Sequence, residues 1–238
     1  MVGRQAADNP MRLDLEEAAG MVPGTVFVVN VVLDATRRVV RVVAGHPVAA
    51  HRSGIATGAR MSGVPVTTFA DVVIASSHPM DQDLRQGLKA LANTLRAVRP
   101  GGVHITLVRA VEGVGVMGMG HRRLPIGRGA LRALAPVLLA LVPRLPLKGM
   151  GEEERFFLYF ALQAMRRATL LLYAPAVPAA ARAGLPFVRF VESPDEAIAL
   201  ARRRYPGRAR VLVFPHGGAT YPVLGPAAGG RGAEPAAA

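Results

Sequence analysis

Runs of apolar, mostly β-branched residues alternate along this chain with segments of helical composition. The run DVVIAS at 71–76 is apolar at successive positions rather than at every second one, which indicates a strand buried on both faces. Further strands are predicted at 102–110, 169–175, 186–192 and 209–218. Because helical segments separate these strands, we predict an α/β fold with a mostly parallel, Rossmann-like sheet and helices on both faces.

Two β-rich runs precede this pattern. TVFVVNVVLD (25–34) and RRVVRVVAG (37–45) are separated by a short Ala-Thr connection, which predicts a β-hairpin at the N-terminus. A helix is expected next over 47–61, because Pro47 suits a first helical turn.

The helix that follows the 71–76 strand has clear start and stop signals. We expect Asp81 to cap it and the helix to continue until Pro100 and Gly101. With the strand at 102–110, this segment has the size of a βαβ unit.

The last predicted helix, SPDEAIALARRRYP, carries a capping box. Ser193 is placed as the N-cap, Pro194 at the first helical position and Glu196 at the third. We expect one domain over 1–225, with 128–168 as a helical insertion, and a disordered Gly/Ala/Pro tail over 226–238.

Polar side chains gather where the 71–76 strand ends. In open α/β sheets, ligands bind outside the carboxyl ends of the strands, and SSHPMD is such an end. The helix that follows can attract an anion through its free N–H groups and its dipole. Gln86 and Lys89 project from one face of that helix and Arg85 lies beside Lys89, so the three form a candidate carboxylate site. The alternative is that they are surface residues of an amphipathic helix.

The charge and composition narrow the classes of partner. The net charge is +13, but only two of the 29 Lys and Arg residues are lysines, and the arginines are spread along the chain without an RG or RS pattern. We therefore favour a solvated basic surface over nucleic-acid binding, and an acidic partner or anionic ligand stays open. The absence of cysteine excludes disulfides and thiolate metal ligands and leaves the redox compartment undecided. Because no signal peptide or membrane span is recognised, we expect a cytoplasmic protein without a membrane role.

Other motifs point to chemistry less clearly. GVGVMG (113–118) matches G-x-G-x-x-G after a strand, but HRRLPIG follows where a helix is required, so a loop that contacts ligand through backbone N–H groups is favoured over a nucleotide site. The six histidines include no HxH or HExxH spacing, and we expect no metal and no cofactor bound by this chain. A GxSxG motif is missing.

Several segments taken in order carry a family resemblance. They are DNPMRLDLEEAAGM followed by FVVNVVLD, AGHPVAAHRSG, ADVVIASSHPMDQDLRQGLKAL, EGVG, and SPDEAIALA followed by VLVFPHG. Together they resemble the C-terminal region of the nickel-dependent lactate racemase family, whose members epimerise 2-hydroxy acids. The resemblance covers most of residues 8–222, and its specificity comes from the order of the motifs.

The resemblance implies roles for particular residues. The family's Gln and Lys that contact the substrate carboxylate and hydroxyl correspond to Gln86 and Lys89. Arg85 replaces the family's Tyr, Ser76 and Ser77 replace its glycine pair, His78 takes the aromatic position before the proline, and His46 stands where an acid is usual. An additional cation would suit a more anionic substrate, so we count Lys89, Gln86, Arg85 and His78 as candidate substrate-binding residues.

The family's catalytic groups, by contrast, cannot be mapped onto this chain. In the family a preceding domain supplies the lysine-tethered nickel pincer nucleotide and the acid–base histidines, whereas Lys89 and Gln86 can orient a substrate but cannot move its proton. The first hypothesis is therefore the substrate-binding half of a 2-hydroxyacid racemase or epimerase, inactive alone and active with a separate pincer domain. The chain would be either a natural split subunit or a truncated reading frame. The alternative is a non-catalytic module of the same fold that binds a small anion or an acidic protein.

Overall fold

The computed structural model describes residues 9–34, 36, 38–116, 126–144 and 149–225. The contacts divide the chain into two units. The N-terminal unit comprises residues 1–65 and 221–223, and the sheet unit comprises 66–220 and 224–238. The tail expected over 226–238 lies outside the described residues, as do parts of the glycine-rich loop and of the helical insertion.

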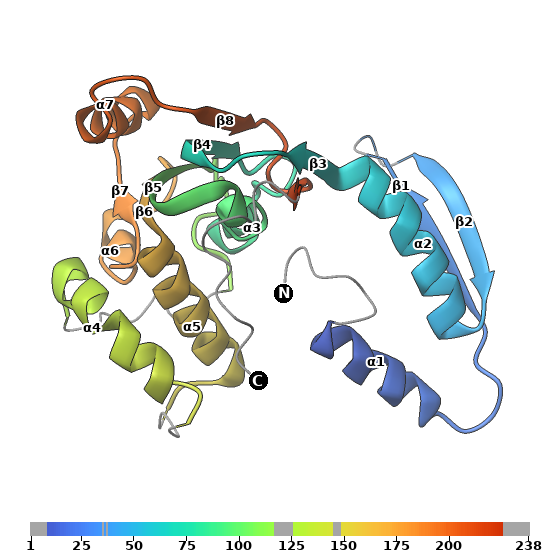
Figure 1. Ribbon diagram of the computed structural model, residues 1–238. Coiled ribbons are helices and arrows are strands. Elements are labelled where there is room, and N and C mark those ends of the chain that lie inside the picture. Colours follow the sequence, from blue (N-terminus) through green and yellow to red (C-terminus); the bar gives the residue numbers. More distant parts are fainter. Residues whose placement is uncertain (1–8, 35, 37, 117–125, 145–148, 226–238) are drawn as a thin grey trace. The chain divides into compact units, whose positions relative to one another are not determined.

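The N-terminal unit contains the predicted hairpin. Its elements are α1 (Pro10–Gly20), the antiparallel strands β1 (Val28–Leu33) and β2 (Val39–Gly45), and α2 (Pro47–Ser62), which begins at Pro47 as predicted. The helix α2 covers one face of the hairpin, where a Cβ at Gly54 would lie 3.5 Å from Val43 and 3.7 Å from Val32. Figure 1 shows the two strands side by side with α2 along one face.

The opposite face of the hairpin is apolar and exposed. Its exposed side chains are Val29, Val31 and Leu33 of β1 and Val40 and Val42 of β2.

A further two-stranded sheet pairs β3 (Gly63–Val66) with β9 (Tyr221–Leu224).

The sheet unit is built on a five-stranded parallel sheet, which confirms the predicted fold class. Its strands are β4 (Ala70–Ser76), β5 (Val98–Leu107), β6 (Ala168–Tyr173), β7 (Arg189–Phe190) and β8 (Val211–Phe214). Their order is β7-β6-β5-β4-β8, and every neighbouring pair is parallel. β8 therefore lies beside β4, although the chain reaches it last.

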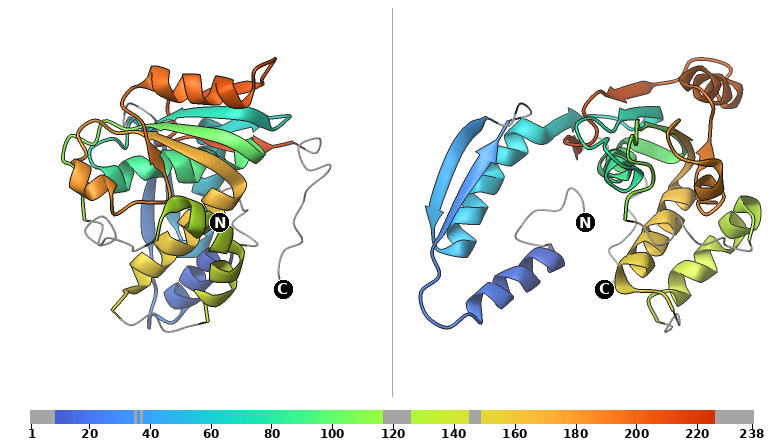
Figure 2. Two further views of the ribbon diagram at one scale, coloured as in Figure 1. Left: turned by 90° about the vertical axis from the view of Figure 1, so that its left-hand side faces the viewer. Right: turned by 180° about the vertical axis from the view of Figure 1, so that it is seen from behind.

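Helices cover both faces of this sheet. Figures 1 and 2 show α7 (Pro194–Arg204) on one side, and α3 (Leu84–Thr94) and α5 (Glu152–Arg167) on the other. The helix α4 (Arg128–Leu141) packs on α5, and the short α6 (Ala179–Arg182) precedes β7.

The main core lies between the sheet and the α3 side, and it includes Val73, Leu84 and Leu162. α3 approaches the sheet closely at Gly87, where a Cβ would lie 2.2 Å from Val108. A smaller core under α7 includes Val103 and Leu171. Together the two cores leave the central strands buried on both faces, as the continuous apolar runs predicted.

Three predicted boundaries are wrong, each by a few residues. Asp83, not Asp81, caps α3, and its carboxylate accepts a hydrogen bond from the N–H of Gln86 at 2.7 Å. α3 ends at Thr94 with one 3₁₀ turn (Leu95–Ala97), so Pro100 and Gly101 lie within β5. The strand expected at 186–192 pairs over two residues only.

The cap of α7 is confirmed in its first half. Ser193 accepts a hydrogen bond from the N–H of Glu196 at 3.1 Å. The Glu196 carboxylate instead accepts from the N–H of Glu192 at 2.8 Å, one residue before the position that a capping box uses.

Candidate functional site

The strand order creates a switch point between β4 and β8. From β4 the chain continues to β5 on one side, whereas β8 lies on the other side of β4. Ligands of open α/β sheets bind at such points, outside the carboxyl ends of the strands. His78 follows β4 and His216 follows β8, and their ring centroids are 5.3 Å apart. The sheet therefore brings together two exposed imidazoles that lie 138 positions apart in the sequence.

The turn after β8 is fixed against β4 and α3. The side-chain amide of Asn93 donates to the carbonyl oxygens of Gly217 and Gly218 at 3.0 and 3.2 Å. A Cβ at Gly218 would lie 2.1 Å from the carbonyl oxygen of Ser77, so only glycine fits there. These contacts hold the turn that carries His216 beside the turn that carries His78.

Gln86 and Lys89 lie on the same side of α3 as Asn93. The three residues are spaced by three and four positions, so their side chains project from one side of the helix. Lys89 is exposed, and Gln86 and Asn93 are half-buried. Among the described residues, the Lys89 ammonium makes no ion pair or hydrogen bond. The predicted pair thus shares a helix side with the residue that anchors the His216 turn.

Arg85 is held elsewhere. Its Nε donates to Oε1 of Glu153 at 2.9 Å, and a second guanidinium nitrogen reaches the same oxygen. Glu153 belongs to the first turn of α5, so the ion pair directs Arg85 toward that helix. Arg85 was predicted to bind substrate, but in the structure its guanidinium is paired with Glu153.

The expected anion site at the start of α3 is not open, because the protein's own acceptors occupy its N–H groups. The N–H groups of Leu84 and Arg85 donate to the carbonyls of Gly113 and Val114 at 2.9 and 3.3 Å. The next N–H, that of Gln86, is taken by the Asp83 carboxylate. Anion binding at a helix start needs free N–H groups, so side chains have to supply any anion contact at this rim.

The glycine-rich loop has a structural role in its described part. Gly113 and Gly115 adopt φ values of +75° and +72°, and a Cβ at Gly115 would lie 2.6 Å from the carboxyl carbon of Asp83. The two glycines let the loop fold against the α3 cap and present its carbonyls to the helix. Residues 117 and 118 of the motif lie outside the described part.

A third histidine is buried beneath α3, away from the rim. His104 lies between Thr94 and Thr106, with its Nε2 2.8 Å and its Nδ1 3.1 Å from their hydroxyl oxygens. Because the Thr94 hydroxyl donates to the carbonyl of Ala90, it accepts from Nε2–H, and Thr106 donates to Nδ1. Burial lowers the pKa of His104 to about 3, so this histidine is a neutral core residue.

The described part of the chain contains no group of three or more His, Cys, Asp or Glu side chains placed to hold a metal ion. Within the same residues, no helix has the length and apolar character that crossing a bilayer requires.

The fold and the site together define a Rossmann-like α/β protein with a candidate small-anion site at the switch point of its sheet. No protein-family model matches the chain. The lactate racemase of Thermoanaerobacterium thermosaccharolyticum is 32% identical over 110 residues, which is 45% of this chain and 25% of that protein. The lactate racemase of Lactiplantibacillus plantarum is 31% identical over 97 residues, or 40% of this chain and 23% of that one.

The fold is also that of a solved lactate racemase. The structure of the Thermoanaerobacterium thermosaccharolyticum apoprotein matches with a TM-score of 0.72 and 20% identity, over 91% of this chain and 50% of that chain. The sequence matches and the shared fold show that the chain is related to the lactate racemase family. The chain spans about a quarter of the curated relatives in sequence and half of the solved chain in structure.

Proposed function

We propose that this chain is the substrate-binding half of a 2-hydroxyacid racemase or epimerase, and that a separate domain supplies the catalytic groups. The observation that carries the proposal is the Lys89 ammonium, which has no ion pair or hydrogen bond with any described residue and lies on the side of α3 that Asn93 anchors to the switch-point turn. Lys89 would neutralise the substrate carboxylate, and Gln86 would hydrogen-bond to its hydroxyl or second carboxylate oxygen. These contacts would hold and orient a small acid, whereas the proton transfer needs groups that Lys89 and Gln86 do not supply.

His78 and His216 extend the site at the same rim. Either imidazole can donate or accept a hydrogen bond, so the pair suits the hydroxyl or carboxylate of a small acid. His216 lacked a sequence signal, because only the strand order places it beside His78.

The nickel pincer nucleotide of the family does not fit the described residues. They bring together no three metal-ligating side chains, and the one lysine among them, Lys89, is assigned to the substrate. The pincer and the acid–base histidines would therefore belong to the separate domain. The exposed apolar face of the hairpin supports a partner of this kind, because such faces mark interaction surfaces.

Thermal-shift titration with lactate and related 2-hydroxy acids tests the binding step. At a hundredfold excess over its dissociation constant, a ligand should add about 2.7 kcal/mol of stability. Lys89→Ala and Gln86→Ala should remove the shift. The matched control is Arg202→Ala, which should keep the shift, because Arg202 is an exposed residue of α7 that makes no ion pair or hydrogen bond within the described residues.

The second experiment adds a nickel-loaded N-terminal half of a lactate racemase and follows racemisation of lactate. Activity that depends on Lys89 supports the full proposal. Binding that depends on Lys89 without activity in the mixture favours the alternative of a non-catalytic binding module. No shift with any 2-hydroxy acid and no activity in the mixture would contradict the racemase proposal.

A further inference from the structure

A pocket lies in the sheet unit, away from the switch point. Its volume is about 410 Å³, within the range of small-molecule sites. The strand residues that line it, Val103 of β5 and Ala168–Leu171 of β6, precede the carboxyl ends of those strands. The pocket is therefore distinct from the rim that carries His78 and Lys89.

The short β7 leaves this pocket open. β7 pairs with β6 only at Leu171 and Leu172, so the first half of β6, from Ala168 to Leu170, has no strand partner on that side. An unpaired strand edge exposes backbone donors and acceptors. Here long side chains from α4 and α7 surround the edge instead of a further strand.

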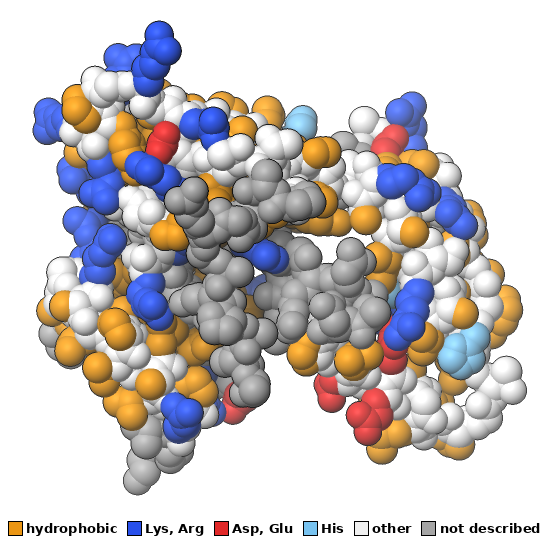
Figure 3. Space-filling model, in the orientation of Figure 1, with side chains coloured by type: hydrophobic (Ala, Val, Ile, Leu, Met, Phe, Trp, Pro, Cys, Tyr) orange, Lys and Arg blue, Asp and Glu red, His pale blue; other side chains and the backbone are white. Residues whose placement is uncertain are grey.

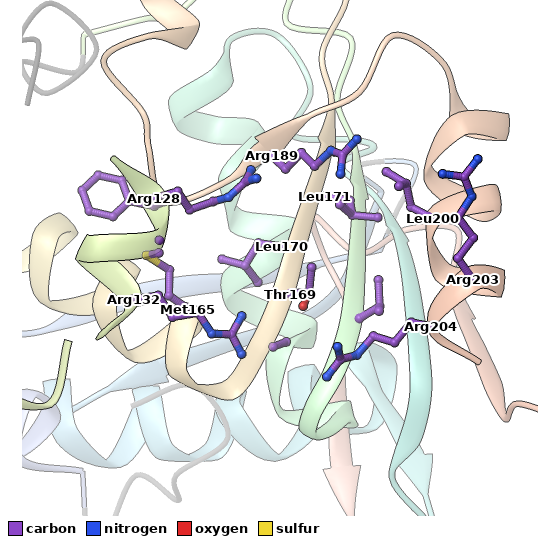
Figure 4. Close-up of a pocket in the computed structure, with 14 residues that line it drawn as sticks. Arg128, Arg132, Met165, Thr169, Leu170, Leu171, Arg189, Leu200, Arg203 and Arg204 are labelled. Carbon is purple, nitrogen blue, oxygen red and sulfur yellow. The ribbon is translucent and has the colours of Figure 1, made fainter. Parts of the chain in front are cut away.

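Five arginines surround the pocket, and none of the described residues that line it is acidic. They are Arg128 and Arg132 of α4, Arg189 of β7, and Arg203 and Arg204 of α7. Figure 4 shows Arg128 and Arg132 extending from α4 toward β6, with Arg204 extending toward the sheet from the side of α7. Basic side chains also gather over α7 in the space-filling view of Figure 3.

Most of these arginines have no acidic partner in the part of the chain that the structure describes. Arg204 donates a hydrogen bond to the carbonyl of Gly101, and Nη2 of Arg189 lies 3.5 Å from Oε1 of Glu196. Among the described residues, Arg128, Arg132 and Arg203 make no ion pair or hydrogen bond. Several unpaired guanidinium groups around one hollow repel one another, and an anion bound between them would relieve that repulsion.

The floor of the pocket has a different character. It is formed by apolar side chains that include Met165, Leu171 and Leu200, and the Thr169 hydroxyl lies among them. An inorganic anion would leave this floor uncovered, whereas a molecule with an anionic end and an apolar or ring-bearing body would use both parts.

From these features we infer that the pocket binds a small organic phosphate ester. The planar guanidinium fork matches phosphate oxygens in pairs, and the floor receives the body of the molecule. A nucleic-acid backbone would fit better along an extended basic stripe than into a single pocket of this size. The inference does not depend on the proposed racemase role, because the two sites share no residue.

Isothermal titration calorimetry with ADP and with inorganic pyrophosphate tests this inference. Both should bind the full chain, ADP more tightly because pyrophosphate has no body to cover the floor. Arg128→Gln/Arg132→Gln should weaken ADP binding by at least about tenfold, since each removes a charge-assisted contact. The matched control is Arg202→Gln/Arg208→Gln, which removes the same charge from arginines that do not line the pocket, and it should change binding less than twofold.

Two further measurements complete the test. Circular dichroism should show both double variants folded, because all four arginines are exposed. Lys89→Ala should bind ADP like the parent chain. The inference would be overturned if ADP did not bind, or if both double variants lost the same affinity for ADP. It would also be overturned if a single-stranded oligonucleotide bound more tightly than ADP and both double variants weakened that binding equally.

Discussion

The hairpin of the N-terminal unit and the five-stranded sheet of the sheet unit are built from similar Val-rich strands, yet they are covered very differently. β4 and β5 are packed between helices on both faces, with Val73 and Ile105 almost fully buried. Among the described residues of the N-terminal unit, α2 covers one face of the hairpin, and Val29 and Val31 on the other face are exposed. A Val-rich run therefore predicts a strand, whereas the elements packed against it decide how much that strand contributes to stability.

The largest effect should come from a cavity in the core of the sheet unit. Leu162→Ala should lower the free energy of unfolding of this unit by about 2 to 5 kcal/mol, because Leu162 is fully buried. Val31→Thr in the hairpin should change it by about 0.5 kcal/mol or less, because Val31 is exposed. Urea unfolding followed by circular dichroism, with hydrogen exchange to assign each unit, measures both. Equal losses for the two variants would contradict the contrast.

Two helical glycines should respond to alanine in opposite directions. Gly87→Ala places a Cβ 2.2 Å from Val108 and should cost about 1 to 3 kcal/mol. Gly58 of α2 has nothing within 4 Å of such a Cβ, so Gly58→Ala should stabilise the chain by about 0.5 to 1 kcal/mol. The melting temperatures of the two variants give the sign directly. A stable Gly87→Ala protein would show that α3 can move away from β5 at little cost.

Mild acid should weaken the sheet unit first. Burial lowers the pKa of His104 to about 3, so the unfolded chain takes up a proton near pH 6.5 while the folded chain does not. Between pH 7 and pH 5 the sheet unit should therefore lose about 2 kcal/mol. In the N-terminal unit, burial also lowers the pKa of His51, so this unit loses some stability over the same interval, but less because His51 is only half-buried. Hydrogen bonds from Thr36 and Arg38 lower the pKa of Asp34, and the contribution of Asp34 is lost only as the pH falls below the ordinary aspartate value of 3.8.

Hydrogen exchange at pH 7 and pH 5 measures this difference between the units. His104→Asn is the control, and its stability should stay nearly constant over the same interval. A pH dependence that survives this substitution would assign the effect to other groups.

Local patterns predicted most of the elements. The continuous apolar runs gave β4, β5 and β6, and the serine and proline at 193 and 194 gave the start of α7. The end of α3 was missed because Val98 fits a helix as well as the strand that it joins. Asp81 and Asp83 are equally good caps by type, and the loop carbonyls that bond to α3 place its start after Asp83.

The candidate site could be predicted only in part, because its composition depends on strand order. The spacing of Gln86 and Lys89 on one helix is local and is visible in the sequence. Two other contacts join segments that are far apart in the chain, namely the ring contact of His78 with His216 and the ion pair of Arg85 with Glu153. No local signal marks such pairs, since each depends on which strand or helix becomes the neighbour of which.

The start of α3 has one more consequence. Its first N–H groups donate to the Asp83 carboxylate and to carbonyls of the loop after β5. The position of the helix start therefore depends on these backbone and cap contacts and not on the side chains at the rim. Under the proposed function, selectivity for one acid over another would rest on rim side chains such as Lys89, which is exposed. A protein arranged in this way can acquire a new preference through one or two surface substitutions while its framework remains intact.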